Sequence, residues 1–388
     1  MSRTNEQPFR ILGGAAAVAG LLLGMAALST AQKPAPESFE ALARAAAAAV
    51  ESDPERSVTL ARKGLELRPE WPEGWFYLGG ALYRLKRYPE AVDAFHKGLA
   101  RDPGNPVGWA ILGLSEAELG RSPEALSDIQ KGETLGLGSL SMETAVRQKA
   151  ATILIGQSAF DRAVTQLQPL AQRHVDTPAL VALIGLCALT DARRPEEVPP
   201  ARRPVVMAAG RALWAAIGRQ PPKETEENFR QLVAAYPKEP GVHYAYGLFL
   251  LNGPSQESAL PEFQKETAAN PSHWPSLLSI SYLETKQDHP ELGLRAAEKA
   301  RQSAPDAYRW LCDAEMGRAL LAMDQPEKAV PLFEESARLK ADNARTHFYL
   351  AKAYRKVGRK ADAEKQDAEF MRLGAEQDPA AFPGSAPQ

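Results

Sequence analysis

The sequence has little cysteine, few aromatic residues and almost no net charge. Two cysteines in 388 residues exclude a small scaffold held together by disulfide bonds. Lysine and arginine total 46 against 48 aspartate and glutamate residues, so the chain lacks the positive field that binds nucleic acid through bulk charge. Aromatic residues make up 7% of the chain, whereas alanine is common throughout, which favours closely packed helices over sheets. We expect an all-α protein that does not bind nucleic acid.

Motifs with a recognised chemistry are also missing. The sequence contains no H-E-x-x-H zinc motif, no phosphate-binding G-x-x-x-x-G-K motif, no EF-hand loop and no C-x-x-C pair. A short stretch at Gly113–Ala117 resembles a nucleophile elbow, but it lacks the final glycine and falls inside an expected helix. The six histidines do not have the spacing of metal ligands on one helix face. We therefore expect no enzyme activity, no cofactor and no metal, and we expect Cys187 and Cys312 to be buried free thiols.

Residues 1–31 have the features of an export signal. Arg3 and Arg10 precede an uncharged stretch over residues 11–28, and Ser29-Thr30-Ala31 supplies the small residues that a signal peptidase recognises. The uncharged stretch is close to the shortest length that spans a bilayer, so an uncleaved membrane tether is the alternative. Both interpretations place the rest of the chain outside the cytoplasm, in the periplasm or the extracellular space. Residues 32–37 are expected to form a short linker.

Cleavage after Ala31 predicts that the mature protein begins at Gln32. Intact-mass measurement of the exported protein would then show the loss of residues 1–31. A protein that keeps Met1 and is extracted only with detergent would establish the membrane tether instead.

A sequence repeat with a period of about 34 residues dominates the chain from residue 38 onward. Pro69 and Pro103 lie exactly one period apart, and Trp75 and Trp109 share the same phase. Within residues 72–105, apolar side chains recur at the spacing of one helix face in two successive segments, with Gly or Ala where the two helices would cross. Because small side chains let antiparallel helices approach closely, each unit predicts a helical hairpin. The units start near residues 38, 72, 106, 144, 206, 240, 274, 310 and 344.

The units resemble the tetratricopeptide repeat family, whose first helix carries the pattern W-x2-L-G-x2-Y. The segments Trp75–Gly79 and Trp109–Gly113 match that pattern, and His243 and His347 replace the tryptophan in two later units. The resemblance extends over residues 38–376. It implies a right-handed superhelical solenoid of helix-turn-helix repeats.

One interruption divides the expected solenoid. Four prolines between residues 190 and 204 cannot continue as an interior helix. We therefore expect an N-terminal array over residues 38–189, a Pro/Arg-rich linker over residues 190–205, a C-terminal array over residues 206–376 and a disordered tail over residues 377–388. The arginines of the linker suit either a docking loop or a solvated connector, and we favour the connector.

The resemblance implies a role in binding proteins, because stacked hairpins expose the inner faces of their first helices as one groove. The candidate groove residues are Phe76, Tyr83, Tyr244, Tyr282, Arg318, Arg345, Phe348, Lys352 and Arg355. The last four share one expected inward face, where cations around an aromatic ring favour an acidic partner. The alternative for these residues is that the aromatic rings cover neighbouring helices and the charges are solvated. We expect a non-catalytic scaffold for a protein or peptide, or alternatively an accessory subunit of an envelope assembly, secretion or polysaccharide-export complex.

Overall fold

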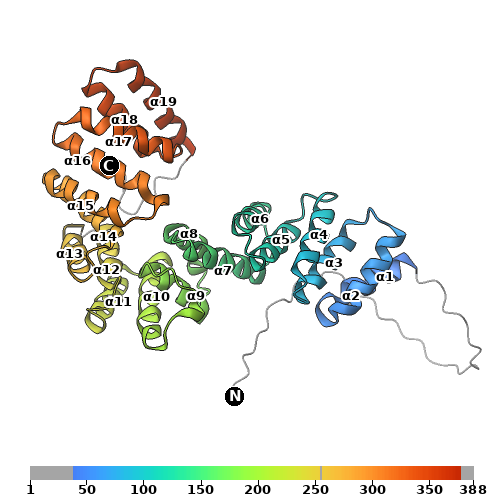
Figure 1. The fold of residues 1–388 in the computed structure, drawn as a ribbon. Coiled ribbons are helices and arrows are strands. Elements are labelled where there is room, and N and C mark those ends of the chain that lie inside the picture. Colours follow the sequence, from blue (N-terminus) through green and yellow to red (C-terminus); the bar gives the residue numbers. More distant parts are fainter. Residues whose placement is uncertain (1–37, 254–255, 377–388) are drawn as a thin grey trace, which may run out of the picture. The chain divides into compact units, whose positions relative to one another are not determined.

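The computed structural model describes residues 38–253 and 256–376, and these residues form α-helices and short 3-10 turns without a β-strand (Figure 1). The export or tether segment over residues 1–31, the linker over residues 32–37 and the tail over residues 377–388 lie outside the described residues. The chain divides into two compact bodies between Leu170 and Ala171. We call the residues before this point the N-terminal body and those after it the C-terminal body.

The N-terminal body is built from consecutive helical pairs. Its helices are α1 (Phe39–Ser52), α2 (Pro54–Leu67), α3 (Pro72–Arg84), α4 (Tyr88–Leu99), α5 (Pro106–Glu118), α6 (Ser122–Leu135), α7 (Leu140–Gly156) and α8 (Phe160–Gln172), which contains the division. The pairs α1–α2, α3–α4 and α5–α6 pack along their length, and each first helix also contacts the first helix of the next pair. The all-α class and the repeated hairpins are confirmed.

The C-terminal body continues the same construction. Its helices are α9 (Pro178–Ala188), α10 (Arg203–Ile217), α11 (Pro222–Ala235), α12 (Val242–Leu251), α13 (Ala259–Ala269), α14 (Trp274–Lys286), α15 (Pro290–Ser303), α16 (Arg309–Ala322), α17 (Pro326–Leu339), α18 (Ala344–Lys356) and α19 (Lys360–Glu376). Four pairs follow α11, from α12–α13 to α18–α19, and α14, α16 and α18 contact one another in series. First helices therefore stack on first helices, which brings their inner faces together.

Proline and side-chain caps set where the helices begin. The side chain of Asn105 accepts a hydrogen bond of 2.8 Å from the Gly108 N–H at the start of α5, and Asn343 does the same for Thr346 at the start of α18, at 2.9 Å. Such caps satisfy N–H groups that have no partner inside the helix. Proline occupies the first turn of most other helices, where its missing N–H costs nothing. The boundaries are thus fixed locally by the residues of each connector.

A buried phenylalanine on the second helix fills the space beside a glycine on the first. The pairs are Gly79 with Phe95, Gly247 with Phe263, and Gly317 with Phe333. These rings are at most 1% exposed, and a Cβ atom on the facing glycine would come within 2.9 Å of each ring. At α5–α6 the glycine instead meets backbone, because a Cβ on Gly113 would lie 2.8 Å from the carbonyl oxygen of Ala125. In these three pairs the glycine therefore accommodates an aromatic ring and does not meet another small residue.

Four of the connectors between pairs accept a hydrogen bond from a ring N–H of the helix that follows them. The four bonds run from Trp75 to the Pro69 carbonyl at 3.0 Å, from Trp109 to Pro103 at 2.8 Å, from His243 to Pro237 at 3.0 Å and from His347 to Ala341 at 2.9 Å. The ring always reaches a carbonyl six residues earlier in the chain. A histidine Nε2–H therefore replaces the indole N–H at the same position, and packing accounts for both histidines.

The Pro/Arg-rich segment lies inside a helical pair, which differs from the predicted linker between two arrays. The helices α9 and α10 pack against each other across it. A Cβ atom on Gly185 would lie 2.0 Å from the Val206 carbonyl oxygen, and one on Gly210 would lie 2.0 Å from that of Val181. The prolines end α9 and shape two 3-10 turns, Pro195–Glu197 and Pro200–Arg202, and the chain then returns along α9. The division between compact bodies falls earlier, at residues 170 and 171.

The arginines of this insertion are bonded within the chain. The Asp191 carboxylate accepts hydrogen bonds from Arg193 at 2.5 Å and from Arg202 at 3.1 Å, and Arg202 also reaches Glu239 at 2.6 Å. Burial acts to raise the pKa of Asp191, but the bonds from the two arginines hold it below its ordinary value. Arg194 pairs with Glu197. The insertion is therefore held to the chain by ion pairs that compensate Arg193, Arg194 and Arg202, and it is not a free basic docking loop.

Candidate partner-binding surface

Three first helices of the C-terminal body bring charged and aromatic side chains together. Tyr282 comes from α14, Glu315 and Arg318 come from α16, and Arg345 and Tyr349 come from α18. We call these five residues the Tyr–Arg cluster. Three of them, Tyr282, Arg318 and Arg345, were predicted groove residues, and the stacking of α14, α16 and α18 places them side by side.

Each arginine of the cluster lies over both tyrosine rings. The Cζ atom of Arg318 is 4.8 Å from the ring centre of Tyr282 and 5.4 Å from that of Tyr349. The Cζ atom of Arg345 is 5.3 Å and 5.7 Å from the same two centres. These distances are within the range of cation–π attraction, which strengthens where water is excluded. The two rings thus hold both guanidinium groups between neighbouring helices.

One carboxylate lies between the two guanidinium groups. Glu315, 4% exposed, forms an ion pair with Arg318, which is 9% exposed. The Glu315 Oε1 atom is also 3.8 Å from Nη2 of Arg345. Burial acts to lower the pKa of Arg318, but Glu315 and the tyrosine hydroxyls raise it above its ordinary value. Arg318 therefore stays charged, and its charge is compensated inside the protein.

The cluster encloses almost no empty space. The cavity beside it measures about 10 Å³ and is lined by residues that include Trp310, Leu311, Asn343, Arg345 and Tyr349. That volume is about the space that one water molecule needs. The cluster is therefore no small-molecule pocket, and a partner would contact its outer edge.

The predicted inward face of α18 is divided between two neighbours. Arg345 turns toward Glu315 of α16, whereas Phe348 and Arg355 turn toward α19. The Phe348 ring centre is 5.5 Å from that of Phe370, and Arg355 forms an ion pair with Asp367. The expectation of one shared face was wrong because α19, the second helix of the last pair, reaches across part of it.

Phe348 and Lys352 are predicted residues of this helix that are open to solvent. Phe348 is 42% exposed and its α19 contact Phe370 is 37% exposed, while Met371, the residue after Phe370, is 72% exposed. Lys352 is exposed on the next turn of α18, and no ion pair is found for it within residues 256–376. We call Phe348, Lys352, Phe370 and Met371 the terminal patch. An apolar surface thus lies beside a free positive charge.

The predicted groove residues of the N-terminal body pack against their own neighbours. Phe76 fills the space beside Gly98, where a Cβ atom would come within 2.7 Å of its ring, and it stacks near Phe95. The Tyr83 ring centre is 5.8 Å from that of Tyr88. Burial, followed by the charge of Glu118, raises the pKa of Tyr83 to about 12. These two aromatic residues serve the packing of the repeats.

Tyr244 is likewise a packing residue. Its ring centre is 5.0 Å from the imidazole of His273 and 5.9 Å from the ring of Phe263. The imidazole accepts the Ser276 N–H at the start of α14 through Nδ1, and burial lowers the pKa of His273 to about 4. A neutral imidazole suits this capping role, because only the unprotonated nitrogen can accept a hydrogen bond.

Two members of the Tyr–Arg cluster escaped the sequence analysis, although the repeat contains the signal for them. Glu315 and Tyr349 are separated by one period of the repeat, as are Arg318 and Lys352. The spacing that places Arg318 and Lys352 on the inner face therefore also places Glu315 and Tyr349 there. A charge on the inner face of a first helix, such as that of Arg318, can thus be compensated by a residue one turn away on the same helix, such as Glu315.

Two stretches of the chain match the tetratricopeptide repeat family, over residues 72–105 and residues 314–372. The chain is a tetratricopeptide-repeat protein. Its fold is that of a protein-interaction scaffold, and the second matched stretch contains four of the five residues of the Tyr–Arg cluster. A comparison with curated protein sequences found no match.

Solved tetratricopeptide-repeat structures resemble the chain at low identity. MamA of Desulfovibrio magneticus RS-1, from residue 41 to its end, is 19% identical with a TM-score of 0.39, covering 45% of this chain and 97% of MamA. PilF of Pseudomonas aeruginosa is 18% identical with a TM-score of 0.40, covering 46% and 79%. Yeast Tom70 is 12% identical with a TM-score of 0.36, covering 88% of this chain and 77% of Tom70.

Within residues 38–253 and 256–376, no helix combines the length and the apolar character that crossing a membrane requires. Over the same part of the chain, no three His, Cys, Asp or Glu side chains are grouped so that they could hold a metal ion. Cys187 and Cys312 are buried free thiols, as predicted.

Proposed function

We propose that the chain is a non-catalytic scaffold that binds an acidic segment of a partner protein or peptide at the terminal patch, beside the Tyr–Arg cluster. The observation that carries the proposal is the exposed Phe348, which lies against Phe370 and is followed one turn later by the exposed Lys352. The patch thus supplies an apolar contact and a charge on one surface.

The apolar part of the patch supports binding of a partner side chain. Large hydrophobic side chains that are exposed elsewhere in the described residues are single leucines, such as Leu67, Leu135 and Leu292. At the patch, Phe348 and Phe370 are instead in contact with each other, and the exposed Met371 follows Phe370 in the chain. Grouped apolar side chains mark interaction surfaces more often than scattered ones, and a central aromatic residue commonly contributes most of the binding energy.

The charged part of the patch supports an acidic partner. Arg355 and Lys356 are compensated by Asp367 and Asp324, whereas Lys352 has no such ion pair in the described residues. The charge of Lys352 is therefore available to a partner's carboxylate. Long-range attraction of this kind raises the rate of association more than it slows dissociation.

The Tyr–Arg cluster holds in position the helix that carries part of the terminal patch. Its arginines and rings join α14, α16 and α18, so the helix that carries Phe348 and Lys352 is held in place before a partner arrives. A preformed surface loses less conformational entropy on binding. Arg318 is buried and acts through the position of α18, while Arg345 borders the patch.

Substitutions in the patch separate the two contributions. We expect Phe348→Ala to weaken binding mainly through faster dissociation, because the desolvated contact is lost. We expect Lys352→Glu to slow association, and most strongly at low salt, because exposed charges interact over a longer range there. Binding kinetics at two salt concentrations would measure both effects, using short peptides selected from a random library on the wild-type chain.

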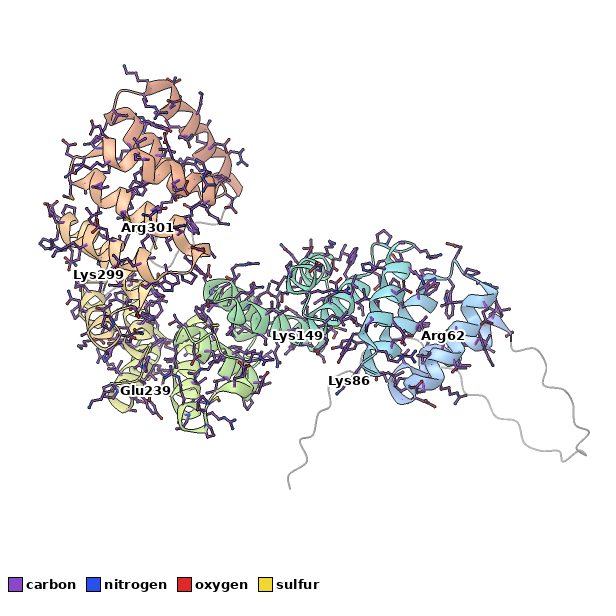
Figure 2. All side chains as sticks on the ribbon, viewed as in Figure 1. Arg62, Lys86, Lys149, Glu239, Lys299 and Arg301 are labelled. Carbon is purple, nitrogen blue, oxygen red and sulfur yellow. The ribbon has the colours of Figure 1, made fainter. Side chains whose placement is uncertain are left out.

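The matched control is Lys299→Glu, which makes the same charge change at an exposed lysine of the second helix α15 (Figure 2). It should leave both rate constants unchanged. Selected peptides that lack Asp and Glu, or that bind both patch variants as they bind the wild type, would contradict the proposal. Circular dichroism of each variant shows that the helices are intact.

A further inference from the structure

Two carboxyl groups are buried next to each other between α5 and α6 in the N-terminal body. Glu116 of α5 is 3% exposed and Asp128 of α6 is 6% exposed. The charge of Asp128 acts directly on Glu116, and two ionised carboxylates cannot form a hydrogen bond because neither carries a donor hydrogen. A proton on Glu116 would supply the hydrogen-bond donor that the two carboxyl groups otherwise lack.

The surrounding charges leave Glu116 without compensation. Lys131 pairs with Asp128 at 2.9 Å, and the Oε2 atom of Glu116 is buried without a hydrogen-bond partner. Glu124 adds to the repulsion and Arg121 opposes it. Cations on the helices that pack around α5 pair with other carboxylates: Arg84 with Glu51, Lys97 with Asp93, Arg101 with Glu70, Arg147 with Glu133 and Glu143, and Lys149 with Glu118. Burial, followed by the hydrogen bond and the charge of Asp128, raises the pKa of Glu116 to about 7.

The two helices are in close backbone contact around the buried carboxyl groups. A Cβ atom on Gly113 would lie 2.8 Å from the Ala125 carbonyl oxygen, and one on Gly132 would lie 2.9 Å from that of Pro106. The helices thus meet backbone to backbone near both ends of the pair. Close-packed interfaces of this kind change by opening, because small shifts would lose contacts along the whole length.

We propose that Glu116 holds a proton where it faces Asp128, and that loss of this proton makes the α5–α6 pair open more readily. The closed pair binds the proton more tightly than the opened pair, in which Glu116 is in water. Proton release on opening therefore favours the closed pair at low pH, and the closed pair loses stability as the pH rises from about 4.5 through about 7.

Opening of the α5–α6 pair would affect the neighbouring helices of the N-terminal body. The helix α5 contacts α3, α4 and α7, and α6 contacts α7. Opening of α5 from α6 therefore loosens the junction between the pairs that precede it and the helix that follows it. The carboxyl pair is a pH-controlled weak point in the repeat array, independent of the proposed partner surface.

Hydrogen exchange followed by mass spectrometry tests this on the full chain, at about pH 5.5 and about pH 8 after correction for the intrinsic exchange rate. We expect amides of α5 and α6 to lose protection about tenfold or more between these conditions, while amides of α1 and α2 change much less. Glu116→Gln keeps the size and supplies a hydrogen-bond donor but carries no proton to lose. It should remove the pH dependence and increase protection at about pH 8.

The matched control is Glu118→Gln, which removes an exposed carboxylate from the same helix and should keep the wild-type pH dependence. Should Glu116→Gln fail to fold, Asp128→Asn supplies the amide from the other side and should also remove the dependence. The proposal is overturned if α5 and α6 of the wild type respond to pH as α1 and α2 do, or if the folded amide variant keeps the wild-type response.

Discussion

Replacing Gly185 with alanine is expected to destabilise the C-terminal body by about 3 kcal/mol or more. The added Cβ would lie 2.0 Å from the carbonyl oxygen of Val206, and a backbone atom in a helix cannot turn aside as a side chain can. Overpacking of this kind forces helices apart, with losses at or above the upper end of the usual range. Urea denaturation followed by circular dichroism would measure the change in the free energy of unfolding.

Gly156→Ala is the control, because Gly156 is also helical and a Cβ there would meet no atom within 4 Å. Alanine should be neutral or stabilising at that position by up to about 1 kcal/mol, since it is the better helix former. Gly79→Ala should fall between the two, because the atom that it meets belongs to the Phe95 ring. Equal stability of the Gly185 and Gly156 variants would contradict the close approach of α9 and α10.

Removing the charge of Arg301 (Figure 2) should cost about 3 kcal/mol of stability. Its Nε atom is 2.8 Å from Oδ1 of Asp313, and the Asp313 side chain is wholly buried. Arg301→Met keeps much of the apolar stem but leaves a buried carboxylate without its ion pair. Lys299→Met, at an exposed position on the same helix, should change stability little. Urea denaturation compares the two variants directly.

The pH dependence of the Arg301→Met variant gives an independent check. Burial already raises the pKa of Asp313, and Arg301 opposes that effect. Without the arginine the pKa should rise further, so the folded state binds a proton more tightly than the unfolded state does. Stability should therefore recover as the pH falls and decline as it rises. Adding Asp313→Asn should restore most of the loss at neutral pH, and a variant whose stability shows no greater pH response than the wild type would exclude this explanation.

The period of the sequence repeat was enough to predict the helical pairs over residues 72–135 and from residue 242 onward. Each of those pairs is set by contacts within one unit, such as Gly247 beside Phe263. The α9–α10 pair could not be predicted in this way. Its contact joins Gly185 and Gly210, and the insertion between them does not fit the period of the repeat. The four prolines of that insertion indicated a boundary between arrays, whereas the chain turns back there and α10 packs against α9.

The candidate surface was predictable to the extent that position in the repeat determines it. Tyr282, Arg318 and Arg345 occupy inner-face positions of stacked first helices, and the structure brings them together. The state of their charges was not predictable, because it depends on Glu315, whose distance to Arg345 follows from how α16 and α18 stack. The direction of Phe348 depends on α19, and its contact with Phe370 has no counterpart in the pattern of the repeat.

The ring N–H bonds to the connectors can form only in a fixed order during synthesis of the chain. In each of the four cases the carbonyl precedes the ring by six residues, so this bond to the connector comes from the helix that follows it. A ribosome makes the chain from its N-terminus, and Pro69 therefore leaves it before Trp75 does. At these four connectors the carbonyl has no ring N–H partner until the following tryptophan or histidine has been synthesised. A chain that stalls inside such a connector therefore lacks this hydrogen bond after its last helical pair.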